Sequence, residues 1–237
     1  LQEIREEIGP IAFARSFELT PISSETIIFS GDWLINAYYD ASLELRQPGE
    51  MVAAFDFAFS DARSGGDPDY SVCLVAWMTH DNHIYLVDML RVRASFPEFS
   101  RRALGLCNHY SVARAIGEAN GPQKGLVQQL NEESRFPVMP AKRVTDKVTR
   151  AAARQAFVES GRLHLPLEET QDAPGVKVAH KAVFVPLFDE MSAFPVAGHD
   201  DTVDAAIDLM DLASSSKPPS KPVRIKRPAD LGRIYGD

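Results

Sequence analysis

The chain has 237 residues, of which 45% are hydrophobic and 24% charged, and its 33 acidic residues against 25 Lys and Arg give a formal net charge of −8. This is an ordinary globular composition, long enough for one large domain or two small ones. No run of about 18 apolar residues occurs, and the first residues lack the basic-then-apolar pattern of a signal peptide. The only cysteines, Cys73 and Cys107, are too few for a disulfide framework and lack CxxC spacing for zinc.

The first fifty residues predict mainly helical pieces. Residues 1–17 are rich in Glu, Arg and Leu/Ile and are interrupted by Pro10, which favours a short helical lead-in. A short strand is expected at Glu25–Phe29 and a helix around Trp33–Leu45, before a polar turn at 46–49.

A buried strand follows at 51–60 (MVAAFDFAFS), an apolar run that is broken by Asp56. A long turn over 61–70 separates it from two more strands, 71–79 and 83–92, which are joined by a tight turn. Together these segments predict a three-stranded antiparallel meander with a carboxylate in the middle of its first strand.

Helices and short strands alternate through the second half of the chain. Glu118 falls where the strand at 111–119 should end, and Gly161 marks the end of an amphipathic helix at 146–161. The last 24 residues are rich in Ser, Pro, Lys and Arg, which is typical of a flexible basic tail. The other expected elements are helices at 95–110, 123–131 and 187–194, a strand at 136–139, an extended piece at 162–166 and a polar loop at 167–178.

The segment 198–210 (GHDDTVDAAIDLM) places several acids at the start of a helix. Its apolar residues recur at helical spacing, while Asp201, Asp204 and Asp208 form an adjacent stripe. Acids in a first helical turn can simply complement the helix dipole or cap its free amides. Crowded like charges repel unless a cation or solvent relieves them, so a divalent metal site is the alternative.

Acids thus fall in the first strand (Asp56), at the end of the fourth (Glu118) and at the head of a late helix (Asp200 and Asp201). This order of elements resembles the α/β ribonuclease H-like fold, a mixed sheet of antiparallel meander and parallel strands flanked by helices. Hydrolysis of a phosphodiester needs negative charge neutralised on the attacking and leaving oxygens, which two carboxylate-held cations can do. Mg²⁺ and Mn²⁺ prefer such oxygen ligands.

Four blocks in order carry a more specific resemblance over roughly residues 50–212: FDFAFSDARSGGDPDYS, IGEANGPQKGLVQQL, DKVTRAAARQAFVESGRLHLP and LFDEMSAFPVAGHDDTVDAAIDLM. They resemble the C-terminal nuclease domain of the large terminase subunit of tailed bacteriophages and prophages. The resemblance implies a metal-dependent endonuclease that cuts concatemeric viral DNA during genome packaging. Residues 1–45 would then lead in from an upstream ATPase motor, 46–213 would form the nuclease domain and 214–237 the basic tail. No Walker-type phosphate loop occurs in this chain.

The resemblance also implies site residues. Asp56 would bridge the metals, Glu118 would be the second ligand and Asp201 the third, with Asp200 as its neighbour or alternate. His199 would orient a carboxylate or the attacking water. Asp69 has a weaker claim to the metal, and Asp204, Asp208 and Asp211 are interpreted as an ordinary acidic helix face.

Basic residues flank the start of the helix at 146–161, where they could contact a DNA backbone. A solvated helix face explains the same pattern equally well. These residues are Lys142, Arg143, Lys147 and Arg150.

The implied cofactors are Mg²⁺ or Mn²⁺, with two ions when DNA is bound. The implied partners are double-stranded DNA, the motor, the portal and the small terminase subunit, without a membrane, in the cytoplasm of an infected or lysogenic bacterium. Two alternatives remain at this point: another ribonuclease H-like enzyme such as a resolvase or integrase, or a non-catalytic module that grips DNA or docks in a packaging motor.

Overall fold

The structure is a computed structural model, and it describes residues 27–41, 47–58, 69–121, 123–141, 143, 145–169, 177–178 and 182–215. The lead-in helix at 1–17, the turn at 61–68, Lys142 and the basic tail beyond residue 215 lie outside these ranges. The predicted domain boundaries therefore stay predictions.

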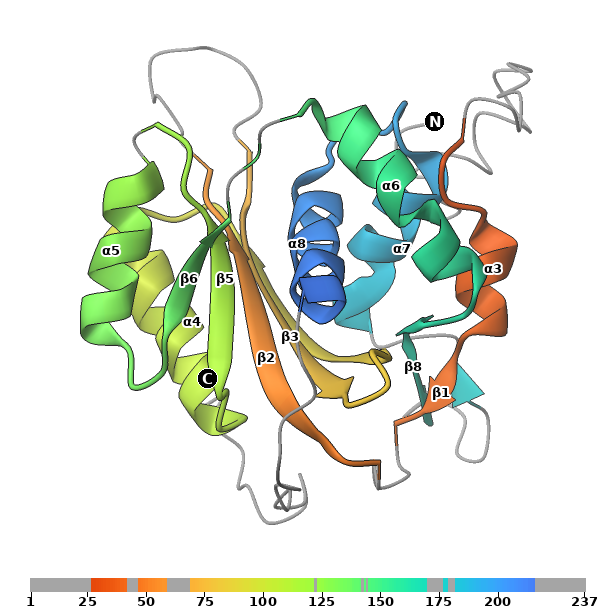
Figure 1. Ribbon diagram of the computed structural model, residues 1–237, viewed down its shortest axis with the longest axis horizontal. Coiled ribbons are helices and arrows are strands. Elements are labelled where there is room, and N and C mark those ends of the chain that lie inside the picture. Colours follow the sequence, from red (N-terminus) through yellow and green to blue (C-terminus); the bar gives the residue numbers. More distant parts are fainter. Residues whose placement is uncertain are drawn as a thin grey trace.

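A six-stranded mixed sheet forms the centre of the molecule, with the strand order β6-β5-β2-β3-β4-β7 (Figure 1). The antiparallel meander is confirmed, since β3 pairs antiparallel with both β2 and β4. Parallel pairs extend the sheet on both sides: β5 pairs with β2, β6 pairs with β5, and β7 pairs with β4. The strands span Gly49–Asp56 (β2), Ser71–Thr79 (β3), Ile84–Val92 (β4), Arg114–Glu118 (β5), Val138–Ala141 (β6) and Leu163–His164 (β7).

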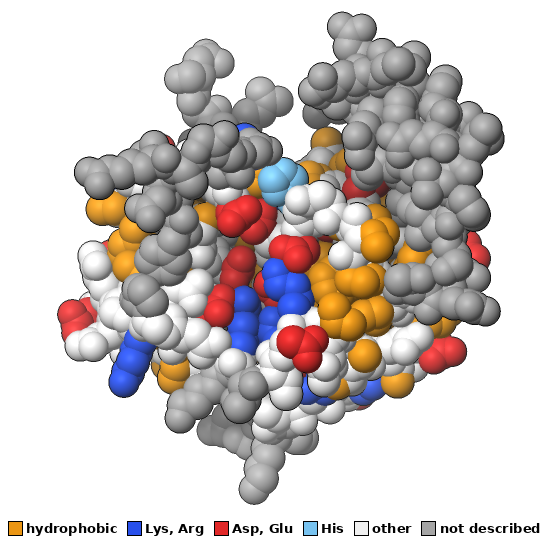
Figure 2. Space-filling model, turned by 90° about the horizontal axis from the view of Figure 1, so that it is seen from above, with side chains coloured by type: hydrophobic (Ala, Val, Ile, Leu, Met, Phe, Trp, Pro, Cys, Tyr) orange, Lys and Arg blue, Asp and Glu red, His pale blue; other side chains and the backbone are white. Residues whose placement is uncertain are grey.

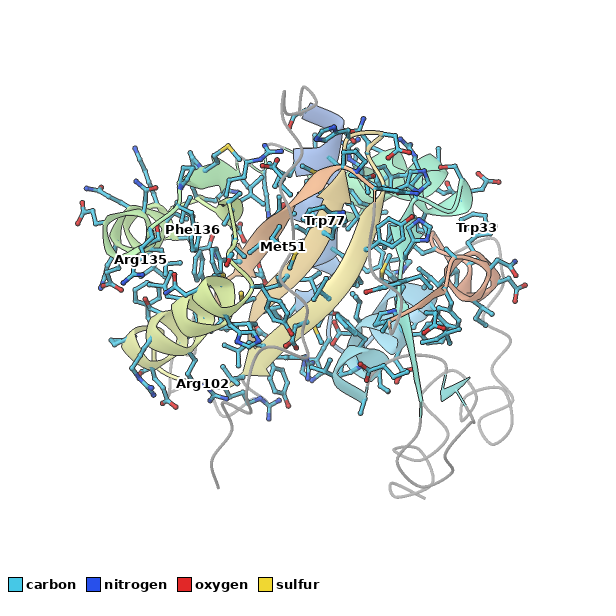
Figure 3. The ribbon with its side chains drawn as sticks, turned by 90° about the horizontal axis from the view of Figure 1, so that it is seen from below. Trp33, Met51, Trp77, Arg102, Arg135 and Phe136 are labelled. Carbon is cyan, nitrogen blue, oxygen red and sulfur yellow. The ribbon has the colours of Figure 1, made fainter. Side chains whose placement is uncertain are left out.

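Alternate residues of β2 face two separate cores. Val52 and Ala54 point to one face of the sheet, whereas Met51, Ala53 and Phe55 point to the other. Met51 pairs in register with Trp77 of β3, and Figure 3 shows both side chains on the sheet face seen from below. Because side chains alternate along a strand, Asp56 continues the row of Val52 and Ala54.

Helices cover both faces of the sheet (Figure 1). Helices α4 (Phe96–His109) and α5 (Gln123–Glu133) lie against the Met51 side. The other face carries α8 (Asp201–Ser215), which contacts β2, β3, β4 and β5 and is itself covered by α6 (Lys147–Glu159) and α7 (Val185–Ala193). All ten residues from Asp201 to Met210 are therefore buried.

Local signals account for several helix ends. The side chain of Asp146 accepts a hydrogen bond from the backbone N–H of Thr149 and caps the start of α6. Gly161, which follows this helix, has a φ of +68°, a left-handed conformation that glycine adopts without strain. The predicted helix at 146–161 is confirmed.

Three predictions for local structure are wrong. The expected helix Trp33–Leu45 is α3 (Gly31–Asn36) followed by strand β1 (Tyr39–Asp40), and residues 27–29 form no strand. The expected polar loop at 167–178 contains two further strands, β8 (Pro166–Glu169) and β9 (Lys177–Val178), which form a second sheet with β1. The backbone N–H groups of Tyr39 and Ala41 donate to the carbonyls of Leu165 and Leu167, partners more than 120 residues away.

Among the described residues, no helix is long and apolar enough to cross a membrane.

Candidate metal centre

The carboxyl ends of two neighbouring parallel strands bring Asp56 and Glu118 to the same edge of the sheet. Asp56 is the last residue of β2, not a mid-strand residue as the sequence suggested, and Glu118 is the last residue of β5. The parallel register pairs Phe55 with Gly117, so the two acids occupy the next position on both strands. Ile116 belongs to the same core as Val52 and Ala54, and alternation therefore turns Glu118 towards α8 as well.

Helix α8 adds two more carboxylates to this edge, and one guanidinium lies between them all. Arg143, on the segment between β6 and α6, approaches Asp56 at 3.0 Å, Glu118 at 2.5 Å, Asp208 at 2.8 Å and Asp204 at 3.5 Å. We refer to these five residues as the Arg143 cluster. Its arginine side chain is only 9% exposed.

The interpretation of Asp204 and Asp208 as an ordinary acidic helix face is wrong, because both are buried. They lie where α8 packs against α6 and face the basic residues of that helix. Arg150 Nη2 lies 2.5 Å from Asp204, and Lys147 Nζ lies 2.7 Å from the same carboxylate. Farther along the two helices, Arg154 and the more exposed Asp211 form another pair at 2.5 Å.

These contacts also bear on the basic residues that were considered for DNA binding. Arg143 and Arg150 are largely buried and paired with acids, so a solvated helix face is wrong for Arg150. Lys147 is 36% exposed and bridges Asp200 and Asp204. Contact of these three residues with DNA stays a prediction, and Lys142 lies outside the described residues.

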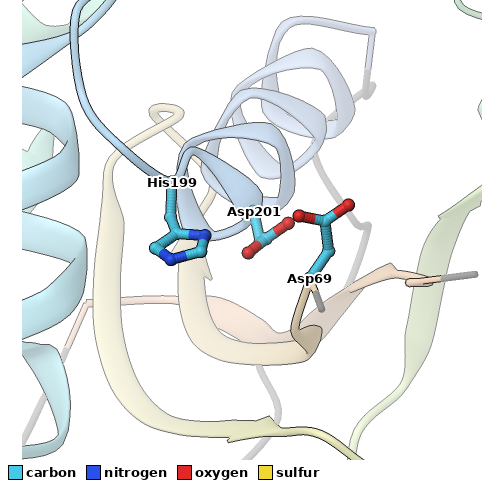
Figure 4. Close-up of side chains that lie close together, drawn as sticks. All are labelled: Asp69, His199 and Asp201. Atoms are coloured by element: carbon cyan, nitrogen blue, oxygen red, sulfur yellow. The ribbon is translucent and has the colours of Figure 1, made fainter. Parts of the chain in front are cut away.

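A second group of possible ligands lies at the start of α8 and consists of Asp69, His199 and Asp201, which we call the Asp69 triad (Figure 4). One ligand atom from each of the three lies within 4.8 Å of the others. Asp69 comes from the residues just before β3, and His199 from the segment that leads into α8. The backbone N–H of Tyr70 donates to Asp201 Oδ2 at 3.3 Å and ties the two segments together.

Glu190 of α7 holds the first turn of α8 in place. Its carboxylate accepts hydrogen bonds from the backbone N–H and the hydroxyl of Thr202, and it accepts another from Arg91 Nη2 at 2.8 Å. Arg91 also lies over the ring of Tyr70, 3.5 Å from its centroid. Reasoning from the sequence missed this network. Its local signal was the pair of acids, Asp189 and Glu190, within the mostly apolar α7.

The predicted ligands therefore fall into two neighbouring groups. Asp56 and Glu118 belong to the Arg143 cluster, whereas Asp201 and His199 belong to the Asp69 triad. Asp200 belongs to neither and pairs with Lys147 at 2.6 Å. Within the described ranges, no three possible ligand atoms that include Asp56 lie within 4.8 Å of one another, and the catalytic and metal roles of these residues stay predictions.

Burial and crowding raise the pKa of several of these acids. Burial raises the pKa of Asp56 well above its usual value, Arg143 opposes this, and Asp204, Glu118 and Asp208 add to it. Burial likewise raises the pKa of Asp208 to about 6, despite Arg143 and Arg150. The pKa of Asp201 is raised by burial, lowered by the Tyr70 N–H, and raised further by Glu190 and Asp69. Desolvation by burial thus outweighs the attraction of Arg143 and Arg150 for the charged forms of Asp56 and Asp208.

Residues 53–212 match the family described as the terminase RNase H-like domain. The chain belongs to this family. None of the curated proteins matches the chain.

Solved structures agree with the fold of this terminase RNase H-like domain. The large terminase nuclease from thermophilic phage G20c with bound zinc is 18% identical, with a TM-score of 0.52, and the match covers 78% of this chain and 97% of that one. The same nuclease with bound cobalt is 18% identical, with a TM-score of 0.50 and coverage of 81% and 99%. A mutant nuclease domain of the large terminase subunit of bacterial virus Sf6 with manganese is 13% identical, with a TM-score of 0.50 and coverage of 78% and 98%. At these identities the likeness establishes the fold.

The donor set at this edge of the terminase domain fits a divalent cation. Carboxylate oxygens suit Mg²⁺ and Mn²⁺, and the imidazole of His199 adds a nitrogen donor that suits first-row transition metals. Figure 2 shows this region from above, where acidic and basic side chains and a histidine gather in a hollow of the surface. Asp69, His199 and Asp201 could bind a cation as they stand, whereas a cation at Asp56 and Glu118 would meet the guanidinium of Arg143.

Proposed function

We propose that this domain is a divalent-metal-dependent endonuclease that cuts double-stranded concatemeric viral DNA during genome packaging. The observation that carries the proposal is the placement of acids at the carboxyl ends of β2 and β5 and at the start of α8, on one side of a terminase RNase H-like sheet. The large terminase nucleases it resembles hold zinc, cobalt or manganese in their structures, which supports a metal-dependent reaction here.

In this proposal Asp56, Glu118 and Asp201 are the metal ligands, with Asp200 as an alternate to Asp201. Mg²⁺ or Mn²⁺, as two ions when DNA is bound, would supply charge neutralisation on the attacking and leaving oxygens of the phosphodiester. Glu190 and the Tyr70 N–H orient the first turn of α8 and the Asp201 carboxylate. His199 lies beside Asp69 and Asp201, where its imidazole can orient a carboxylate or a water.

The DNA backbone would pass over the hollow that contains these acids. Lys147 is the most exposed of Arg143, Lys147 and Arg150 and is the one that a phosphate could reach without uncovering a buried side chain. The upstream motor, the portal and the small terminase subunit are proposed partners, and the proposed setting is the cytoplasm of an infected or lysogenic bacterium.

A plasmid-cutting assay tests the proposal. The domain is incubated with supercoiled plasmid and Mn²⁺ or Mg²⁺, with EDTA as the metal-free reference, and nicked and linear products are measured. Asp56→Asn and Asp201→Asn should each abolish cutting. Asp211→Asn is the matched control, because Asp211 is on the same helix as Asp201 but its side chain is 37% exposed and pairs with Arg154.

Cutting by Asp56→Asn at the wild-type rate would contradict the site assignment, and cutting that persists in EDTA would contradict the metal requirement. Circular dichroism on each variant separates loss of activity from loss of fold. A wild-type domain that binds Mn²⁺ but cuts no DNA would favour the non-catalytic DNA-gripping alternative.

A further inference from the structure

Arg143 occupies the place between carboxylates where a cation would be expected. Its two terminal nitrogens contact acids from three separate elements, Asp56 of β2, Glu118 of β5, and Asp204 and Asp208 of α8. All four carboxylates are at most 14% exposed, so water screens their mutual repulsion poorly. A positive charge among them therefore stabilises the metal-free fold.

The four acids depend on Arg143 to different degrees. Asp204 and Asp208 have a second partner in Arg150, and Asp204 has a third in Lys147. In the described structure, the ion pairs of Asp56 and Glu118 are with Arg143. These are the two strand-end acids that the proposed function makes metal ligands.

The backbone of Arg143 is anchored independently of its guanidinium. The side-chain amide of Asn120 donates to the backbone carbonyl of Arg143 at 3.1 Å and to Glu118 Oε1 at 3.4 Å. The segment that carries Arg143 is therefore held next to the end of β5 by a contact that does not involve the guanidinium. Its Nε is buried without a hydrogen-bond partner, so only the terminal nitrogens of the guanidinium bind the cluster.

We propose that Arg143 is a positioning residue that holds Asp56 and Glu118 together in the metal-free domain, and that a divalent cation binds these two acids in competition with its guanidinium. The inference rests on the proposed metal-dependent function for its choice of ligand. A monovalent guanidinium and a divalent ion repel each other, and the guanidinium already engages Glu118 Oε2 at 2.5 Å and Asp56 Oδ1 at 3.0 Å, the carboxylates that a metal would also bind. Arg143 thereby stabilises the empty site and weakens its affinity for metal.

Mn²⁺ titration of the metal-free domain by isothermal calorimetry, without DNA, tests the competition. Arg143→Met keeps an unbranched apolar stem but removes the charge, and it should bind Mn²⁺ roughly 10-fold more tightly than the wild type, a typical coupling between two linked binding events. Arg154→Met is the matched control, since Arg154 pairs with the more exposed Asp211, and its Mn²⁺ affinity should equal that of the wild type. Asp56→Asn should reduce Mn²⁺ binding at this site.

Thermal unfolding supplies a second readout. Without metal, Arg143→Met should unfold at a lower temperature than the wild type, because the four carboxylates lose their shared cation. Saturating Mn²⁺ should raise its Tm by more than it raises the Tm of the wild type. Should the Met variant fail to fold without metal, Arg143→Lys, which keeps the charge but loses the planar fork, should bind Mn²⁺ more tightly than the wild type by a smaller factor.

Unchanged or weaker Mn²⁺ binding in folded Arg143→Met or Arg143→Lys would overturn the competition and leave Arg143 as a structural clamp. This outcome is distinct from a failure of the proposed function. Tighter Mn²⁺ binding by Arg143→Met, together with no plasmid cutting by the wild-type domain, would support the competition and contradict the proposed nuclease function.

Discussion

Glu190 and Thr202 connect two helices through two hydrogen bonds to one carboxylate: the backbone N–H of Thr202 donates to Glu190 Oε2 at 3.0 Å, and the threonine hydroxyl donates to the same oxygen. Asp201, the residue before Thr202, belongs to the Asp69 triad. The Glu190 carboxylate of α7 thus accepts a hydrogen bond from the Thr202 N–H, a free amide in the first turn of α8. This contact holds the candidate metal ligand Asp201 in position.

Glu190→Gln should destabilise the domain by about 3 kcal/mol, because it leaves Arg91 without its buried counter-charge and weakens the cap on α8. The change can be measured as the free energy of unfolding in urea. Glu98→Gln is the control, since Glu98 forms an exposed pair with Arg102 at 3.7 Å and should change stability by less than about 1 kcal/mol. Equal effects of the two substitutions would show that Glu190 has no special structural role.

Gly49 lies where β2 begins and has no room for a side chain. A Cβ at this position would lie 2.4 Å from the carbonyl oxygen of Met78 and 2.9 Å from the ring of Trp77. Gly49→Ala should therefore cost about 1–3 kcal/mol in unfolding free energy, as overpacked sites do. Gly105→Ala, in helix α4 with nothing within 4 Å of the added carbon, should instead stabilise by up to about 1 kcal/mol. A stabilising Gly49→Ala would contradict the packing at the start of β2.

His164 should make stability depend on pH in mildly acidic solution. Its Nδ1 donates to the carbonyl of Ala37 at 2.8 Å, so its Nε2, 2.8 Å from His83 Nδ1, is the acceptor of the neutral ring. Burial lowers the pKa of His164, and His83 lowers it further, against opposing effects of the Ala37 carbonyl and Asp81. The unfolded chain therefore binds the proton more readily than the folded one. This contribution to stability is complete above the unfolded pKa of about 6.5 and is lost as the pH falls through the folded pKa.

Urea unfolding at pH 7.5 and pH 5.5 can isolate this effect. His164→Asn keeps a donor for Ala37 but cannot be protonated, so its loss of stability between the two pH values should be smaller than that of the wild type. Identical losses in the two proteins would exclude His164 as the titrating group.

His199 should influence which metal binds. An imidazole nitrogen favours first-row transition metals over Mg²⁺, so His199→Ala should weaken Co²⁺ binding by roughly 10–100-fold while changing Mg²⁺ binding less. The visible absorption of Co²⁺ reports directly on the ligand set. His109→Ala, on α4 across the sheet, should leave the Co²⁺ spectrum unchanged. A Co²⁺ spectrum unaffected by His199→Ala would remove this residue from the metal site.

Local patterns predicted much of the fold and part of the site. The apolar run around Asp56, the turn-separated strands after it and the helical spacing of 146–161 are visible within short windows, and the central meander and α6 follow from them. Alternation along β2 also determines on which face of the sheet Asp56 lies. The acids at the strand ends and the start of α8 are therefore recognisable as unusual from their immediate neighbours in the chain.

Partners distant in the sequence were not predictable in the same way. Strands β1, β8 and β9 are short and exist through hydrogen bonds to one another, so no local period marks them. The ion pairs of Asp204 and Asp208 were also not predictable from local sequence. These acids of α8 meet Lys147 and Arg150 of α6 only because the two helices pack together.

The sequence by itself marked Asp56 and the acids at the start of α8 as unusual, because an acid in an apolar strand or helix start stands out from its neighbours, but it did not predict that Asp204 and Asp208 are buried. Only the tertiary structure decided how that charge is balanced. Packing of α8 between the sheet and two helices places Arg143 among four carboxylates and leaves Asp69, His199 and Asp201 as a separate group. Which acid meets which cation depends on distances across the fold, and these distances are set by the packing of elements rather than by the order of residues.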